Sequence, residues 1–305
     1  SSTSSSSSSE DGRIETAKKA LRDIEDSLGI DSSAGPTIIL NNFDSTGLTG
    51  VPLLRVRNVS LLTPDRRRSL VQQLSLQLEP GGSMLIVGDS GTGKSSLLRA
   101  IAGLWRAGSG TIDRPLQEEV FFLPQRPYCT LGSLRDQLKY PGMERWRKSR
   151  SARLQKKYET EDDELLDILS AVKLGGLAKK WANEGRADGD HDDDVDLKSA
   201  LDVKKDWSSI LSLGEQQRLA FGRLLYACPS LAILDEATSA LDLDTEREMY
   251  RVVKERIPGL SVVSVGHRPS LKAFHDTMLR LKQDGQWEVK AVETQEHEQS
   301  VLEQM

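Results

Sequence analysis

The stretch GDSGTGKSS, residues 88–96, follows the short apolar run MLIV and has the spacing GxxxxGK[ST]. Its glycines, Gly88, Gly91 and Gly93, allow the backbone to wrap closely around a phosphate group. The helical pattern that follows would turn its first backbone N–H groups toward the same phosphate oxygens. The spacing therefore predicts a phosphate-binding loop between a buried strand and a helix, as in α/β nucleotide-binding folds.

The residues of this loop are expected to surround the phosphates of a nucleotide. Lys94 is placed to reach the β- and γ-phosphates, and the Ser95 hydroxyl is placed to bind Mg²⁺. A glycine turn without a ligand is the alternative, which the position between a strand and a helix disfavours. The predicted nucleotide-binding residues are Gly88, Asp89, Ser90, Gly91, Thr92, Gly93, Lys94, Ser95 and Ser96.

The composition limits the classes of function. The 305 residues suffice for one large domain or two ordinary ones. A net charge of −5 argues against a general nucleic-acid-binding protein, which normally carries a basic face. Cys129 and Cys228 have no metal-ligand spacing and are expected to be free thiols in a reducing compartment. The sequence holds no apolar run of about 18 residues, so it predicts no membrane span.

Regions of different composition divide the chain. Residues 1–50 are expected to form a flexible, serine-rich linker with one amphipathic helix at 13–30 and loop over 30–50. Residues 51–292 alternate strand-like and helix-like patterns, which predicts a mainly parallel sheet. Within them, the acidic residues 183–206 are expected to be a disordered insertion, and residues 293–305 form a polar tail.

Further polar residues follow apolar, strand-like stretches. LAILDE ends in Asp235, predicted to bind Mg²⁺, and Glu236, predicted to activate the attacking water as general base. His267 ends SVVSVGH and is predicted to contact the γ-phosphate and orient Glu236. Gln125 in LPQRPY is predicted to touch Mg²⁺ or the attacking water, although on physical grounds it is equally a loop glutamine. Parallel strands deliver their carboxyl ends to one crevice, which favours a shared site.

A second anion site is predicted at the start of another helix. LSLGEQQRLAFGRLL, beginning at Leu211, places Ser212, Leu213, Gly214 and Glu215 at the N-terminus of an amphipathic helix. Helix N-termini attract anions. Because the chain already has one phosphate site, a second is useful if it covers the nucleotide bound by another copy.

Together these motifs resemble the nucleotide-binding domain of ABC transporters. The phosphate loop, LPQRPY, LSLGEQQR, LAILDE, SALD and SVGHRPS occur in that family's order, from about residue 54 to 281. Phrases such as GKSSLLRAIAGLW look closest to the fatty-acyl, class D (peroxisomal-type) half-transporters and their bacterial and plastid relatives. The resemblance implies a P-loop NTPase of the ABC type, in which a mainly parallel sheet core joins an antiparallel β subdomain and a helical subdomain.

The resemblance also implies partners and a mechanism. Residues 51–292 would be an ATPase domain that works as a head-to-tail homodimer or paralogous heterodimer. The phosphate site of one copy would face the signature residues 212–215 of the other, with Asp242 of SALD at the dimer interface. Hydrolysis of ATP with Mg²⁺ would then move a transmembrane domain, upstream in the same chain or in a separate subunit.

The implied location is a membrane of an organelle, such as a peroxisome or plastid, or a bacterial inner membrane. The ATPase would lie on its cytosolic or stromal face, the cargo would be fatty acyl or another hydrophobic molecule, and nucleic acid is not an expected partner. The alternative is a freestanding soluble ABC ATPase acting on a non-transport complex, which a single motor without zinc-type cysteines or a basic face disfavours. A nucleotide-gated module without catalysis is less favoured still, because the acid, base and metal positions are all present.

The signature and the nucleobase contact depart from the common family pattern. Leu213 and Glu215 replace a glycine and the glutamine of LSGGQ, which we do not interpret as inactivation. The family usually stacks an aromatic residue on adenine about thirty residues before the loop lysine, but no Phe, Tyr or Trp lies between Phe43 and Trp105. Leu61 and Leu62 are near the expected place, so apolar contact without ring stacking is predicted.

Weak base selectivity follows from such a contact. We expect kcat/KM for GTP to lie within about tenfold of that for ATP, because apolar contact does not distinguish the polar edges of the two bases. Steady-state hydrolysis of both nucleotides under the same conditions measures this ratio, and a larger preference for ATP would contradict the prediction.

Overall fold

The fold is described from a computed structural model, over residues 36–45, 50–142, 158–183 and 196–292. Two compact units divide the chain at residue 37, and the elements below belong to the second. The predicted helix at 13–30 and the polar tail at 293–305 lie outside the described residues. Within the described ranges, no helix has both the length and the apolar character required to cross a membrane.

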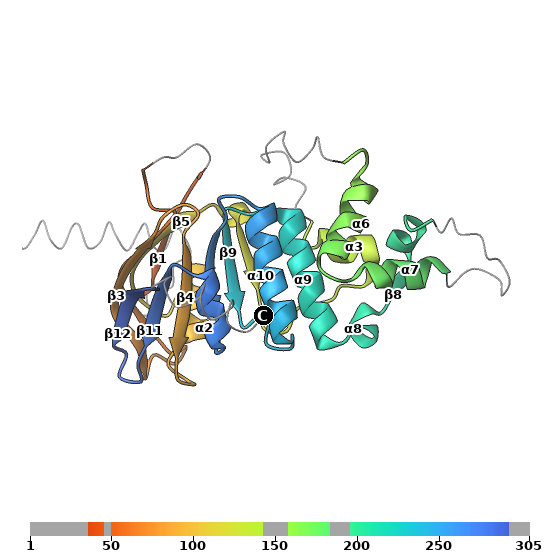
Figure 1. Cartoon of the computed structure of the whole chain (residues 1–305). Helices are drawn as coiled ribbons and strands as arrows, with labels where there is room; N and C mark the ends of the chain where they lie inside the picture. Colours follow the sequence, from red (N-terminus) through yellow and green to blue (C-terminus); the bar gives the residue numbers. More distant parts are fainter. Residues whose placement is uncertain (1–35, 46–49, 143–157, 184–195, 293–305) are drawn as a thin grey trace, which may run out of the picture. The chain divides into compact units, whose positions relative to one another are not determined.

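A six-stranded sheet in the second unit has the order β12-β11-β4-β10-β9-β6. Figure 1 labels β12, β11, β4 and β9 among its strands. The strands β11, β4, β10, β9 and β6 pair in parallel, and β12 is antiparallel to β11. The mainly parallel sheet predicted from the alternating pattern is thus confirmed. Its bounds are β4 (Ser83–Gly88), β6 (Val120–Leu123), β9 (Leu231–Asp235), β10 (Ser261–Val265), β11 (Thr277–Leu281) and β12 (Trp287–Ala291).

Side chains of the central strands alternate between two hydrophobic clusters. Met84 and Ile86 belong to the cluster that includes the buried side of α2 (Lys94–Ile101), whereas Leu85 belongs to the other. That other cluster is formed with α9 (Leu213–Ala227) and α10 (Leu243–Arg256). Because both faces are covered, strands such as MLIV and LAIL are apolar at every position rather than at every second one.

A four-stranded sheet in the order β1-β5-β2-β3 packs against α2. Its strands are β1 (Ile39–Phe43), β2 (Leu54–Leu62), β3 (Ser69–Leu78) and β5 (Gly108–Pro115). The expected antiparallel pairing holds for β2 with β3 and β5, but β1 pairs with β5 in parallel. The loop predicted over 30–50 is therefore wrong at β1, a largely exposed edge strand whose sequence ILNNF shows no alternation and is ordered by its partner.

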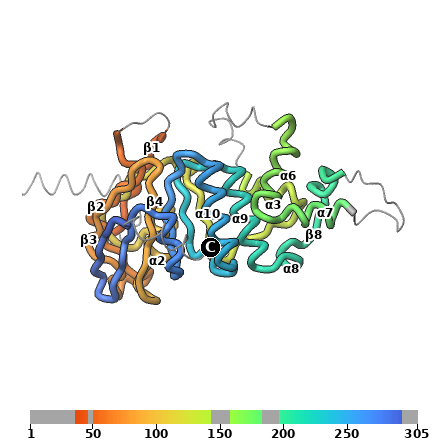
Figure 2. Tube along the Cα trace, viewed as in Figure 1, coloured from red at the N-terminus to blue at the C-terminus, as the bar shows by residue number. Residues whose placement is uncertain are grey.

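Short helices cluster around α9, away from the four-stranded sheet (Figure 2). They are α3 (Leu134–Lys139), α6 (Glu161–Ala171), α7 (Gly175–Asn183) and α8 (Trp207–Ile210). Ser133 and Thr160 cap α3 and α6 with their side chains, which explains where these helices begin.

The acidic insertion is ordered over part of its length. Residues 196–206 form a 3₁₀ helix (Ser199–Asp202) and the strand β8 (Lys204–Lys205), which pairs with β7 (Gly132–Ser133). Ala200 and Leu201 are fully buried, and Arg135 forms an ion pair with Asp202. The disorder predicted for 183–206 is wrong over residues 196–206. Burial of a few apolar side chains stabilises this segment although most of its residues are charged or polar. Residues 184–195 lie outside the described residues.

A buried histidine links β10, α10 and the segment before β11. Nδ1 of His275 lies 2.7 Å from the carbonyl oxygen of Leu271, and Nε2 lies 2.9 Å from the hydroxyl of Ser264. The Tyr250 hydroxyl is 3.1 Å from the same Ser264 oxygen. Burial lowers the pKa of His275 from 6.5 to about 4, so the folded protein holds a neutral imidazole at neutral pH.

Stability should therefore fall in mild acid. Below about pH 6.5 the unfolded chain takes up a proton that folded His275 resists down to about pH 4. This difference favours unfolding by about 2 kcal/mol between pH 7.5 and 5. Urea unfolding at both pH values measures the loss, and His275→Asn should remove this part of the pH dependence. Equal pH dependence in the two proteins would contradict the prediction.

Candidate nucleotide-binding site

The predicted phosphate loop connects β4 to α2. Gly88 and Gly93 have φ angles of 149° and 93°, in the region that favours glycine. A Cβ on Gly88 would lie 2.4 Å from the carbonyl oxygen of Leu281, and one on Gly93 would lie 2.9 Å from Cβ of Leu70. Both positions thus require glycine, for backbone conformation and for space.

Lys94 lies across its own loop. Its Nζ donates to the carbonyl oxygens of Gly88 at 2.7 Å and Asp89 at 2.8 Å. Burial lowers the pKa of the ammonium, while the charges of Glu236, Asp89 and Asp235 oppose that shift. A largely buried cation with only carbonyl partners is suited to a phosphate ligand.

Ser95 and Asp235 meet beside the loop. The Ser95 hydroxyl donates to Oδ1 of Asp235 at 2.7 Å, joining the start of α2 to the end of β9. Burial raises the pKa of Asp235, and the Ser95 hydrogen bond opposes that shift. A hydroxyl and a carboxylate this close are oxygen ligands of the kind that Mg²⁺ uses with phosphates and water. These residues therefore fit the predicted metal.

Glu236 directly follows β9 and has a left-handed backbone conformation, with φ of 50°. Gln125 donates from Nε2 to its Oε2 at 2.8 Å, and Nε2 of His267 lies 3.1 Å from its Oε1. These three side chains come from the loops after β6, β9 and β10. The structure thus brings together Gln125, Glu236 and His267, with the amide of Gln125 directed at the carboxylate.

A cavity of about 360 Å³ is lined by part of the phosphate loop together with Glu236 and His267, whereas Gln125 and Asp235 are not among its lining residues. Leu61 is fully buried in the core, so the predicted contact of Leu61 with adenine is wrong. Leu62 is not among the described lining residues, and its contact with adenine stays a prediction. Trp105, which was not predicted as a site residue, lines the cavity instead. The lining residues are Thr63, Leu70, Ser90, Gly91, Gly93, Lys94, Ser95, Ser96, Trp105, Glu236 and His267.

The signature residues form a helix cap. The Ser212 hydroxyl donates to Oε2 of Glu215 at 2.8 Å, and the Glu215 backbone N–H donates to that hydroxyl at 3.3 Å. A Cβ on Gly214 would lie 3.2 Å from the carbonyl oxygen of Ala240. Residues 212–215 are not among the described residues that line the cavity. Their contact with a second copy stays a prediction.

Asp242 caps the next helix. Its carboxylate accepts the Thr245 backbone N–H at 2.8 Å, and this hydrogen bond lowers the pKa of the exposed carboxyl group. The residue therefore positions the start of α10 within one copy. Its place at a dimer interface also stays a prediction.

Gln217 on α9 is a buried connector that the sequence did not reveal. Its Nε2 donates to the carbonyl oxygen of Gln125 at 3.0 Å and to the Ser239 hydroxyl at 3.1 Å. Its Oε1 accepts the Ala240 N–H at 3.0 Å. The only signal in the sequence is a polar residue within an amphipathic helix. In the structure, it ties the Gln125 loop to the SALD loop.

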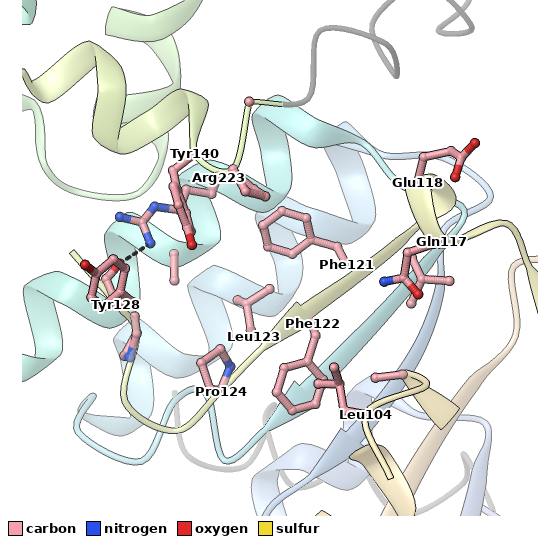
Figure 3. Close-up of a pocket in the computed structure, with 16 residues that line it drawn as sticks. Leu104, Gln117, Glu118, Phe121, Phe122, Leu123, Pro124, Tyr128, Tyr140 and Arg223 are labelled. Carbon is pink, nitrogen blue, oxygen red and sulfur yellow. Dashed lines mark hydrogen bonds between the residues drawn. The ribbon is translucent and has the colours of Figure 1, made fainter. Parts of the chain in front are cut away.

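A larger, mostly apolar groove of about 710 Å³ is lined by residues that include Pro124, the chain neighbour of Gln125 (Figure 3). Leu104 and Tyr128 on its rim are 66% and 65% exposed. Arg223 lies at one end, donating to the carbonyl oxygens of Tyr128 and Gln137, both at 2.6 Å. Pro124 and Pro127, which flank Gln125 on either side, also line the groove.

The fold and the loop define a P-loop nucleotide-binding domain. The family described as ABC transporter matches residues 71–239, and the chain belongs to this family. In the fold alone, it is similar to a bacterial Atm1-family ABC exporter with ATP bound, with a TM-score of 0.60 and 22% identity over 87% of this chain and 43% of that one.

Curated relatives include members of class D. The chain is 42% identical to an uncharacterized ABC transporter ATP-binding protein of Synechocystis sp., over 86% of this chain and 36% of that protein. It is 41% identical to the lysosomal cobalamin transporter ABCD4 of Mus musculus (76% and 34%) and 35% identical to the chloroplastic ABC transporter D family member 2 of Arabidopsis thaliana (80% and 37%). The predicted class D likeness is thereby confirmed. The chain spans about a third of the length of these relatives.

Replacement of Glu236 should separate catalysis from binding. We expect Glu236→Gln to lower ATP turnover by about a hundredfold or more, because the amide cannot accept the proton of the attacking water. The Kd for ATP should stay within about twofold, since the phosphate loop is unchanged. Phosphate release and nucleotide titration measure the two quantities, with the exposed Glu255→Gln as matched control. Unchanged turnover would mean that Glu236 is not the general base.

Proposed function

We propose that this chain is the ATP-hydrolysing motor domain of an ABC half-transporter. The observation that carries the proposal is the Glu236 carboxylate, held between Gln125 and His267 at the phosphate cavity. The site combines a carboxylate with both oxygens oriented, a phosphate loop and a hydroxyl–carboxylate pair. These are the groups that hydrolysis of a nucleoside triphosphate requires.

The residues divide the work by position. Lys94 would exchange its two carbonyl partners for phosphate oxygens, and Ser95 with Asp235 would hold Mg²⁺, which supplies positive charge to the phosphates. Glu236 would take the proton of a water whose oxygen attacks the γ-phosphorus as the bond to the β-phosphate oxygen breaks. Gln125 and His267 orient the carboxylate, so small displacements of either loop would alter the rate.

A second copy would complete each site in a head-to-tail dimer, as a homodimer or with a paralogous chain. Ser212 and Gly214 at the start of α9 would face the γ-phosphate bound by the partner. Before this contact forms, the Ser212 hydroxyl is bonded to Glu215. Formation of the dimer would redirect that hydroxyl to the phosphate, and Asp242 would lie between the two sites.

The apolar groove beside Gln125 is where we place the transmembrane domain. Its rim residues Leu104 and Tyr128 are large and well exposed, which marks an interaction surface. The Gln125 side chain donates a hydrogen bond to Glu236. Pro124 and Pro127, which precede and follow Gln125 in the chain, line the groove. A docked helix would therefore sense, through Gln125, the state of the catalytic carboxylate.

The proposed location is the cytosolic or stromal side of an organelle membrane or of a bacterial inner membrane. One relative is named chloroplastic and another lysosomal, which supports an organelle membrane, and the relative from Synechocystis sp. supports a bacterial one. We propose a hydrophobic cargo of the fatty acyl type. The relative named as a cobalamin transporter adds cobalamin as a compound to test beside it.

The native protein should be found in membranes. We expect intact mass analysis of membrane and soluble fractions of its source to give a membrane-bound species well above 33.8 kDa, or one of about this mass bound to a separate membrane subunit. Affinity capture from detergent extract distinguishes these two forms. A soluble species of 33.8 kDa without a membrane partner would instead support the freestanding ATPase.

A further inference from the structure

The cavity beside the phosphate loop has a wall formed by residues that belong neither to the loop nor to the catalytic group. Its lining comprises the loop and the start of α2, Glu236 and His267, and three other residues: Thr63, Leu70 and Trp105. Leu70 lies under the loop, against Gly93. Trp105 is thus the only Phe, Tyr or Trp among the described lining residues, and the other ring, the imidazole of His267, lies 3.1 Å from the Glu236 carboxylate.

Trp105 is held rigidly at this wall. Its indole N–H donates to the carbonyl oxygen of Leu62 at 3.0 Å, and the Leu62 N–H donates to the carbonyl oxygen of Ala107, also at 3.0 Å. The end of β2 and the turn after α2 are therefore bound to each other on both sides of Leu62. The half-buried ring packs against the hydrophobic cluster below it. An aromatic side chain so fixed loses little conformational entropy when a ligand stacks on it.

We propose that Trp105 contacts the nucleobase of the bound nucleotide. This inference rests on the proposed function, which places the phosphates at the loop. With the phosphates there, the base must lie toward the remaining wall, where the indole offers a π face. The ring comes from the turn after α2, whereas the strand that precedes the phosphate loop supplies none.

The polar group at this wall is already engaged. The Thr63 hydroxyl donates to the carboxylate of Asp65 and accepts the Arg68 backbone N–H at 3.2 Å. It therefore has little capacity left to distinguish the hydrogen-bonding edges of different bases. Stacking on an indole is tolerant of the base, so Trp105 strengthens binding of adenine and guanine nucleotides alike.

The test compares a ligand that has a base with one that lacks it. Isothermal titration of the 305-residue chain with ATP and with inorganic triphosphate, both with Mg²⁺, gives two Kd values per variant. We expect Trp105→Leu to weaken ATP binding about tenfold, the effect of one lost stacking contact, and to leave triphosphate binding unchanged. Trp287→Leu is the matched control, because its indole N–H also donates to a backbone carbonyl, of Gln72 at 3.0 Å, but Trp287 is not a lining residue.

Trp105→Phe keeps a ring and tests the role of packing. It should bind ATP nearly as tightly as the wild type while losing most of the ATP-dependent change in tryptophan fluorescence. Unchanged ATP affinity in Trp105→Leu, or equal weakening of ATP and triphosphate, would overturn the inference, as would a fluorescence change that Trp105→Phe retains. If Trp105→Leu does not fold, the Phe variant decides. A wild-type chain that binds neither ligand would overturn the proposed function itself.

Discussion

The parallel register of three neighbouring strands determines where the site forms. Val265 of β10 lies opposite Ile86 of β4 on one side and Asp235 of β9 on the other. The residues that follow these strands therefore emerge at one edge of the sheet, together with those that follow β6. Backbone hydrogen bonds between strands that are buried on both faces allow no slip in this register, because a slip by one residue would exchange the two hydrophobic clusters.

Buried polar side chains join the loops at this edge to one another. Gln217 connects the Gln125 loop to the SALD loop, and Glu246 accepts the hydroxyls of Thr238 at 2.6 Å and Ser270 at 3.0 Å. Because both connectors are buried, loss of one partner would cost about 1–3 kcal/mol for the group left unpaired. The loops that carry Gln125, Glu236 and His267 therefore depend on each other and on the helices α9 and α10.

The local sequence pattern was sufficient to predict the structure of some parts of the chain and not of others. A few adjacent residues are enough to specify the phosphate loop with its glycines, the apolar strands and the helix caps Ser212 and Asp242. Strand β1 and residues 196–206 do not, because their order comes from pairing with β5 and β7 and from a few buried side chains. Average composition over a window conceals such anchors.

The sequence by itself determined the phosphate loop, and it is the source of the proposed metal-binding hydroxyl and carboxylate, the proposed general base and the proposed second phosphate contact at a helix N-terminus. These depend on residue types at short, fixed spacings. Tertiary structure alone decided which distant residues share a cavity. In the folded chain Leu61 lies in the core, Trp105 lines the phosphate cavity, and Gln217 donates a hydrogen bond to the loop that carries Gln125. The reason is physical, since burial and contact arise from the packing of segments far apart in the chain, and no local spacing records how they pack.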